Sequence, residues 1–187
     1  TLGDVMQQAG YETYVTGKWD LGRLPELIPR ARGFDRDFVM LDSHGSHYNM
    51  TNIYAANPKL VFTEDGKYLS RLPDDYYSSK TFTDKMISFI EDGRTSGKPF
   101  FAFLSYQAPH DPHHVDEPWR SMYQGVYDKG WTYFHRQRFQ TQKELGLLPD
   151  GVELAERYWY LPDSDILSPV VRATVGRHME LYAGMMT

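Results

Sequence analysis

Two cationic side chains, Lys18 and His110, stand in surroundings that could bind an anion. Lys18 lies in the stretch GYETYVTGKWDLG, between a glycine and a tryptophan whose indole can hold the lysine stem while the ammonium group faces an anion. His110 lies in APHDPHH, where two prolines stiffen the loop. A histidine presented in this way can act as a general acid near neutral pH or donate to a developing negative charge. Together the two residues indicate a pocket for an oxyanion.

Each of these residues also has a purely structural explanation. Lys18 can be a surface lysine at a strand end, and His110 can be a histidine satisfied within its own loop. Asp20, two residues after Lys18, can be a turn residue. A metal cluster of His110, His113 and His114 is less favoured, because adjacent histidines seldom point at one ion and no carboxylate or thiolate set stands at the usual spacing. No residue of the chain can be defended as a nucleophile.

The composition suits one globular domain or most of one. The chain has 187 residues, 41% of them apolar, a formal net charge of -5 and no cysteine. The lack of cysteine excludes disulfides, thiolate metal sites and a cysteine nucleophile within this chain. The charge argues against nucleic acid as a partner, and no apolar run approaches the roughly 20 residues that span a bilayer. The compartment is left open.

Lys18 and His110 must be positioned by strands that end just before them. The alternating run at 11–15 predicts a half-buried strand, preceded by a helix over residues 2–9 that Gly10 ends. The nearly continuous apolar run at 100–106 predicts a central strand covered on both faces. Ligands of α/β folds gather beyond the carboxyl ends of strands, so we expect these two loops to lie close together.

The other elements complete an α/β pattern. A helix that Ser78 or Ser79 caps precedes the second strand. Its apolar face is made of Phe82, Met86, Phe89 and Ile90. Further helices are predicted at 127–145, ended by Gly146, and at 169–187, begun by Ser168-Pro169. The apolar face of the last helix is made of Val171, Val175, Met179, Tyr182 and Met186.

Between these units, residues 23–78 carry many turn signals and little sustained period. We expect a long, loop-rich stretch there, with short strands at 61–62 and 68–69. The stretch includes HGSHY, where His44 and His47 are expected in a loop because a glycine separates them. Loops of this length in a compact domain are usually functional or poorly ordered.

The two motifs resemble those of the sulfatase family. AGYETYVTGKWDLG is similar to the family's second signature, Gly-Tyr-x-Thr-x-x-x-Gly-Lys-Trp-His-Leu-Gly, and KPFFAFLSYQAPHDP to its strand ending in Ala-Pro-His-x-Pro. ARGFDRDF, LPDDYYSSKTFTDKMISFI and RHMELYAGMM resemble the bacterial arylsulfatase branch, so the resemblance covers nearly the whole chain. It implies an alkaline-phosphatase-like α/β fold, a three-layer αβα sandwich with a mostly parallel sheet.

The resemblance also implies an activity, the hydrolysis of sulfate monoesters. In this family a formylglycine attacks sulfur, and a divalent cation, usually calcium, holds the sulfate. By motif, Lys18 corresponds to the lysine that contacts the sulfate and the nucleophile. His110 corresponds to the histidine that touches the sulfate and can protonate the leaving alcohol. Implied substrates are small sulfate esters or sulfated glycans, and the implied compartment is the bacterial cytoplasm or periplasm.

By the same resemblance, residues 1–187 are expected to be an incomplete catalytic domain that is inactive as a fragment. The formylglycine, which a formylglycine-generating enzyme makes from a Cys or Ser, is expected upstream of this segment. The calcium ligands are expected on both sides of it. The implied partners include no nucleic acid and no membrane.

Asp20 departs from the family pattern, which has a histidine at this position that hydrogen-bonds the formylglycine. A carboxylate is acceptor-only and would repel a bound sulfate by about 4 kcal/mol at about 4 Å and an effective dielectric near 20. A weakened site, a changed substrate or metal arrangement, and a one-base read error each explain the aspartate. Other functions stay open: a phosphodiester or phosphonate monoester hydrolase, a non-catalytic binder of sulfated ligands, or a structural domain that keeps the motifs only as strand ends.

Overall fold

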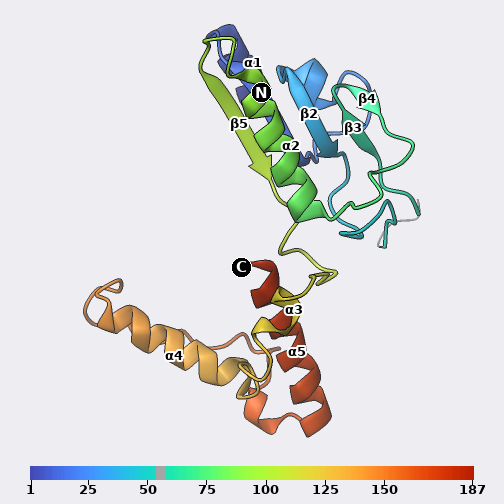
Figure 1. The fold of residues 1–187 in the computed structure, drawn as a ribbon. Helices are drawn as coiled ribbons and strands as arrows, with labels where there is room; N and C mark the ends of the chain where they lie inside the picture. The colour runs from blue at the N-terminus through green and yellow to red at the C-terminus, as the bar shows by residue number, and fades with distance from the viewer. Residues whose placement is uncertain (54–57) are drawn as a thin grey trace. The chain divides into compact units, whose positions relative to one another are not determined.

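The computed structural model describes residues 1–53 and 58–187, which form two compact units, Thr1–His114 and Val115–Thr187 (Figure 1). The described part of the first unit contains a five-stranded sheet in the order β4-β3-β2-β1-β5. Its strands are β1 (Glu12–Lys18), β2 (Arg36–Met40), β3 (Phe62–Glu64), β4 (Lys67–Tyr68) and β5 (Phe100–Ser105). Its helices are α1 (Leu2–Gln8), the short 3₁₀ turn η1 (Pro29–Arg32) and α2 (Ser78–Gly93).

The sheet confirms the α/β class and is mixed within this chain. β1 pairs in parallel with both β2 and β5, whereas β3 pairs antiparallel with β2 and with β4. The prediction of a half-buried strand at 11–15 is wrong in two respects. β1 runs on to Lys18, and its interior residues are buried on both faces because it lies between two strands with packed side chains on either side.

β2 and β5 also differ from expectation. β2 falls within the stretch predicted as loop-rich, because Arg36 and Asp37 interrupt its apolar pattern. The apolar run ending before His110 predicts a central strand, but β5 is an edge strand of the sheet that the described residues form. Phe100 is therefore 50% exposed and Phe103 47% exposed.

Apolar side chains pack on both faces of the sheet. On one face, α2 lies against β1, β5 and β2 and contributes Phe82, Met86 and Phe89, which confirms three members of its predicted apolar face (Figure 1). On the other face the segments that follow β1 and η1 contribute a second cluster. Its buried members are Val15, Trp19, Ile28, Phe34, Val39 and Leu41. Both faces are thus covered around β1 and β2, the strands that lead into the candidate site.

Neither Ser78 nor Ser79 caps α2. Tyr77 is the N-cap residue and makes no capping bond with its side chain. Ser78 instead begins the helix, is fully buried, and places its hydroxyl 2.7 Å from Nδ1 of His47. A serine that the sequence suggests as a cap is therefore part of a buried polar contact.

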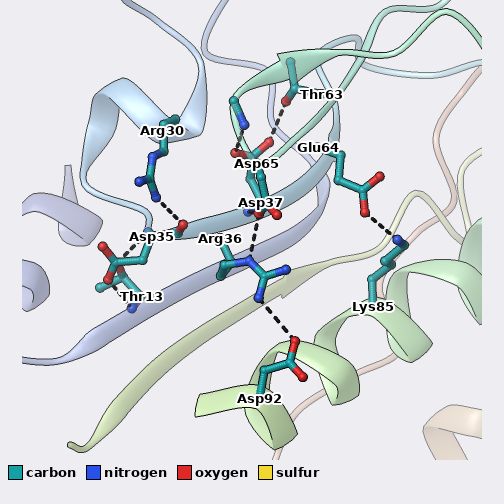
Figure 2. Close-up of polar contacts among 11 residues, drawn as sticks. Thr13, Arg30, Asp35, Arg36, Asp37, Thr63, Glu64, Asp65, Lys85 and Asp92 are labelled. Carbon is teal, nitrogen blue, oxygen red and sulfur yellow. Dashed lines mark hydrogen bonds and ion pairs between the residues drawn. The ribbon is translucent and has the colours of Figure 1, made fainter. Parts of the chain in front are cut away.

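A polar network holds β2 to its neighbours near the start of the strand (Figure 2). Arg36 donates to Asp65 at 2.9 Å and to Asp92 of α2 at 3.3 Å. Asp37 accepts from the hydroxyl of Thr63 at 2.7 Å and from the backbone N–H of Gly66 at 2.8 Å. Burial raises the pKa of Asp37, and these two hydrogen bonds oppose that rise. Arg36 and Asp37, which interrupt the apolar pattern of β2 in the sequence, thus form hydrogen bonds with neighbouring segments of the first unit.

The backbone of β5 leaves no room for a side chain at Gly17 of β1, and replacement of this glycine by alanine is expected to destabilise the protein by about 3 kcal/mol. Its φ is 107°, and an added Cβ would lie 1.8 Å from the carbonyl oxygen of Ser105. Gly10 offers a matched control, because its φ is 88° and a Cβ there meets nothing within 4 Å. Gly10→Ala should cost about 1 kcal/mol for the left-handed backbone alone. Urea unfolding of the two variants measures the difference, and equal losses would contradict the steric argument.

The second unit is helical in its described elements. They are α3 (Trp119–Met122), α4 (Gly130–Glu144), the 3₁₀ turn η2 (Ser164–Ile166) and α5 (Pro169–Met185). Ser168 caps α5 as predicted, by accepting from the N–H of Val171 at 3.4 Å. None of the helices in the described residues is long and apolar enough to cross a membrane.

The buried face of α5 is not the apolar one that the sequence predicts. Gly176, Glu180 and Gly184 are buried, whereas Val171 and Tyr182 are both nearly half exposed. The reason is close approach of the backbone of α3. A Cβ at Gly184 would lie 2.4 Å from the carbonyl oxygen of Trp119.

Candidate functional site

The carboxyl ends of the three parallel strands lie at one edge of the sheet. In the register of the sheet, Gly17 of β1 stands beside Val39 of β2 and beside Ser105 of β5. The loops that leave these strands carry the candidate polar residues, so the predicted neighbourhood of the Lys18 and His110 loops follows from strand pairing.

Lys18 and Asp20 form an ion pair at this edge. The ammonium nitrogen of Lys18 lies 3.6 Å from Oδ2 of Asp20, and the hydroxyl of Ser43 donates to Oδ1 of Asp20 at 2.6 Å. The Lys18 side chain is 21% exposed and that of Asp20 43% exposed. A pair this long and this exposed contributes less than about 1 kcal/mol, so it orients the lysine without locking it.

The backbone at Asp20 is left-handed, with a φ of 56°. Asp, Asn and His adopt this conformation more readily than other residues with a Cβ. The backbone at this position is therefore compatible both with the aspartate of this chain and with the histidine of the family pattern.

Trp19 holds the loop after β1 to the protein core. Its indole is buried, lies edge-on to Phe34 at a ring distance of 5.7 Å, and donates from Nε1 to the carbonyl oxygen of Leu27 at 2.7 Å. We expected the indole to hold the lysine stem. The packing of the indole instead ties the backbone between Lys18 and Asp20 to the second core cluster.

His44 and His110 bring the β2 and β5 loops together. Their imidazole rings stack at 4.8 Å with an angle of 8° between planes. Nδ1 of His110 lies 2.7 Å from the carbonyl oxygen and 2.9 Å from Oδ1 of Asp111. Since both oxygens only accept, Nδ1 carries a proton and Nε2 is the ring atom left for a ligand. A carboxylate behind the ring is the arrangement that orients a histidine for acid–base work.

These contacts make one continuous series from β1 to β5. Lys18 pairs with Asp20, Asp20 accepts from Ser43, and the next residue, His44, stacks on His110. We call this set, Lys18, Asp20, Ser43, His44 and His110, the edge cluster. It combines an ammonium group, a carboxylate, a half-exposed imidazole and a hydroxyl, of which the ammonium group and the imidazole are groups that can interact with an oxyanion.

Two buried side chains, His47 and Gln107, form hydrogen bonds between the loops that follow β2 and β5. His47 is fully buried, and its Nε2 lies 3.1 Å from the carbonyl oxygen of His110. Gln107 is also buried and donates from its amide to the carbonyl oxygen of Gly45 at 2.6 Å. Burial, together with the nearby His110, His113 and His114, lowers the pKa of His47 to about 4, although the bond to the His110 carbonyl opposes this shift.

The low pKa of His47 predicts a pH dependence of stability. The unfolded chain takes up a proton on this ring near its ordinary pKa of 6.5, and the folded protein only near 4. The contribution of His47 to the free energy of unfolding is therefore fully present above about pH 6.5. It is lost as the pH falls toward 4, by about 3 kcal/mol in total. Urea unfolding between pH 4 and 7 measures this change in the free energy of unfolding, with His47→Gln as the non-titrating control. Parallel profiles for the two proteins would contradict the prediction.

Sequence reasoning gave no role to Ser43, His44, His47 or Gln107. A signal exists for His44 and His47, which belong to HGSHY, a stretch that begins four residues after β2 ends at Met40. Had 36–40 been read as a strand, the rule that ligand loops follow strand ends would have brought this segment to the site.

A metal site was considered at His110, His113 and His114. Among the described residues, no group of three or more His, Asp or Glu side chains is arranged to hold a metal ion. His110 and His114 are used in other ways, since His110 stacks on His44 and Nδ1 of His114 accepts from the N–H of His47 at 3.4 Å.

The fold and the edge cluster define an α/β protein with charged and hydrogen-bonding side chains gathered at the carboxyl edge of its sheet. The sequence pattern of the sulfatase family matches residues 1–187. An arylsulfatase of Klebsiella aerogenes is 32% identical over 193 residues, which covers 99% of this chain and 40% of that protein. The chain belongs to the sulfatase family.

Solved structures agree with this assignment at the level of the fold. A sulfatase of Bacteroides fragilis matches 99% of this chain and 36% of its own, with a TM-score of 0.51 and 16% identity. The structure of Ps i-CgsB matches 68% of this chain and 31% of its own, with a TM-score of 0.56 and 22% identity. The alkaline-phosphatase-like α/β fold expected from the motifs is thereby confirmed. The chain spans about 40% of the length of the arylsulfatase.

Proposed function

We propose that this chain supplies part of the active site of a sulfuric ester hydrolase of the arylsulfatase type, namely side chains that contact the sulfate group. The observation that carries the proposal is the edge cluster, in which both family motifs end in one series of contacts from Lys18 to His110. Membership of the sulfatase family supplies the reaction class, the hydrolysis of a sulfate monoester.

In this proposal the two motif residues have different tasks. Lys18 places a positive charge beside the sulfate oxygens, where negative charge is present in the substrate and redistributes during reaction. In its doubly protonated form, His110 donates the Nε2 proton to the oxygen of the leaving alcohol as the bond from that oxygen to sulfur breaks, and keeps the Nδ1 proton that faces Asp111. His44 supports the ring of His110 from one side.

The remaining parts of the reaction are assigned to residues outside this chain. We propose that residues 1–187 are an incomplete catalytic domain, inactive alone. A formylglycine from a residue elsewhere, made by a formylglycine-generating enzyme, would supply the nucleophile, and calcium held elsewhere would bind the sulfate. This division is consistent with the share of the arylsulfatase that the chain covers.

The proposed substrates are aryl sulfates or sulfated glycans. The arylsulfatase name of the Klebsiella relative supports the former. The structural neighbour Ps i-CgsB was solved in complex with k-i-k-neocarrahexaose, a carbohydrate, which supports the latter.

Asp20 favours a second candidate, a sulfatase-like protein that binds sulfated ligands without turning them over. Its carboxylate pairs with Lys18 and so offsets the charge that would otherwise meet the sulfate. A binding protein can tolerate this weakened site, whereas rapid turnover requires the lysine to face the transition state.

The test is hydrolysis by the intact protein, produced together with a formylglycine-generating enzyme. We expect release of inorganic sulfate from an aryl sulfate, with a higher kcat/KM than for an aryl phosphodiester or a phosphonate monoester. The control is the same protein produced without the generating enzyme, which should be inactive. Preference for either phosphorus ester would instead assign the protein to that activity. Binding of a sulfated oligosaccharide by calorimetry without release of sulfate would assign it to the second candidate.

A further inference from the structure

The contact between His47 and the backbone of His110 has a fixed direction. A carbonyl oxygen can only accept, so Nε2 of His47 must carry the hydrogen in its 3.1 Å contact with the His110 carbonyl. Nδ1 of the neutral ring is then an acceptor, and the hydroxyl of Ser78, 2.7 Å away, donates to it. Both ring nitrogens of this fully buried histidine are satisfied in one tautomer.

Ser78 ties this ring to the rigid part of the unit. Its hydroxyl is buried in the first turn of α2, and its backbone N–H donates to the carbonyl oxygen of His47 at 2.9 Å. Side chain and main chain thus both connect His47 to the helix. The helix in turn packs Phe82, Met86 and Phe89 against the sheet.

The result is a path of buried contacts from the core to His110. It begins at α2, passes through Ser78 and the ring of His47, and ends on the carbonyl group of the residue whose imidazole stacks on His44. The N–H of His47 also donates to Nδ1 of His114, four residues further along the same loop. The loop is therefore held at two points by one residue.

We propose that His47 is a positioning residue that fixes the His110 loop, so that the His110 imidazole meets the substrate in one orientation. The inference rests on the proposed function of His110 and deepens it. His47 acts through the backbone of His110, without contact with the substrate. Displacement of a reacting group by about 1 Å can cost about 100-fold in rate, which gives such a residue a measurable effect.

The test compares three variants of the intact protein. His47→Leu removes the donor, and we expect kcat to fall by about 10- to 100-fold with a much smaller change in KM. His47→Gln keeps an N–H donor near the position of Nε2 and should recover most of kcat. Thr16→Val is the matched control, because it removes a buried side-chain bond of 2.9 Å to the carbonyl oxygen of Phe82 in α2, away from His110.

Two further readouts separate positioning from a general loss of stability. In His47→Leu the basic limb of the pH profile of kcat should shift, and a crystal structure should show the His44 and His110 rings no longer stacked. Thr16→Val should change neither. If His47→Leu and Thr16→Val lower kcat equally, or if the stack and kcat survive in His47→Leu, the proposal is wrong.

The crystal structures also distinguish this inference from the proposed function. If the wild-type protein hydrolyses no sulfate ester, the proposed function fails. The positions of the His110 ring in wild type, His47→Leu and His47→Gln then still decide whether His47 fixes it. Should His47→Leu not fold, the milder Ser78→Ala, which removes the hydroxyl but leaves the Nε2 donor, must displace the ring partially for the proposal to stand.

Discussion

Replacement of Lys18 by methionine is expected to lower kcat/KM of the intact protein for an aryl sulfate by about 10²- to 10³-fold, the loss typical of one preorganised charged or donor group at a reacting oxyanion. Methionine keeps much of the apolar stem and removes the ammonium group. Because Lys18 ends a strand that is paired on both sides, the backbone that carries it should stay in place. Steady-state kinetics with an aryl sulfate measures the effect.

The matched control for this change is Lys80→Met. Lys80 also pairs with an aspartate, Asp84 at 2.5 Å, but on the exposed surface of α2. Lys80→Met should leave kcat/KM unchanged, since an exposed pair within one helix contributes little even to stability. Lys18→Arg should restore only part of the activity, because a planar fork cannot replace a compact ammonium in a site built for the latter. Wild-type activity in Lys18→Met would remove Lys18 from the proposed site.

Replacement of Asp20 by histidine is expected to raise the turnover of sulfate esters. The change removes a carboxylate whose repulsion of a sulfate about 4 Å away is about 4 kcal/mol at an effective dielectric near 20. The half-exposed position reduces this effect, so we expect a gain of about 10-fold or more rather than the full value. It also releases Lys18 from its ion pair, and the φ of 56° accepts histidine.

Asp20→Asn separates the two contributions to this gain. Asparagine is close in shape to aspartate, tolerates the left-handed backbone and can still accept from Ser43, but it carries no charge. If charge repulsion limits turnover, Asp20→Asn should recover part of the gain, and Asp20→His more of it through its imidazole donor. The measurement is kcat for an aryl sulfate in the three proteins. An unchanged or lower rate in Asp20→His would show that this aspartate does not weaken the site.

Lys18→Met and Asp20→His each remove one partner of the Lys18–Asp20 ion pair. Lys18→Met removes the charge that the sulfate needs, and Asp20→His removes the charge that competes for it. If turnover of an aryl sulfate falls in Lys18→Met and rises in Asp20→His, the site is catalytic and Asp20 lowers its rate. A loss in Lys18→Met without a gain in Asp20→His would indicate that the aspartate has its own role with the natural substrate.

Several elements of both units could be predicted from local pattern. The face of α2 repeats at helical spacing, and the apolar run before His110 is long enough to mark a strand. Gly10 and Gly146 follow the ends of α1 and α4, as predicted from the need for a left-handed residue there. These features depend on neighbours a few residues apart, so a sequence window contains the information.

Other features depended on residues far apart in the chain. β2 was missed because Asp37 is a poor strand residue until Thr63 and Gly66 satisfy its carboxylate. The position of β5 at the sheet edge depends on which strands are present to pair with it. Ser78 looked like a helix cap because its partner, His47, lies 31 residues away.

For the candidate site, residue types and motif spacing are enough to single out Lys18, His110 and the departure at Asp20. The pairing of Asp20 with Lys18, the stacking of His44 on His110 and the contact of His47 with the His110 loop are seen only in the folded chain. The reason is physical. Residue type fixes which charges and donors a loop can offer, whereas distance and burial, which set their strength and their protonation, arise only when separate strands end at one edge of the sheet.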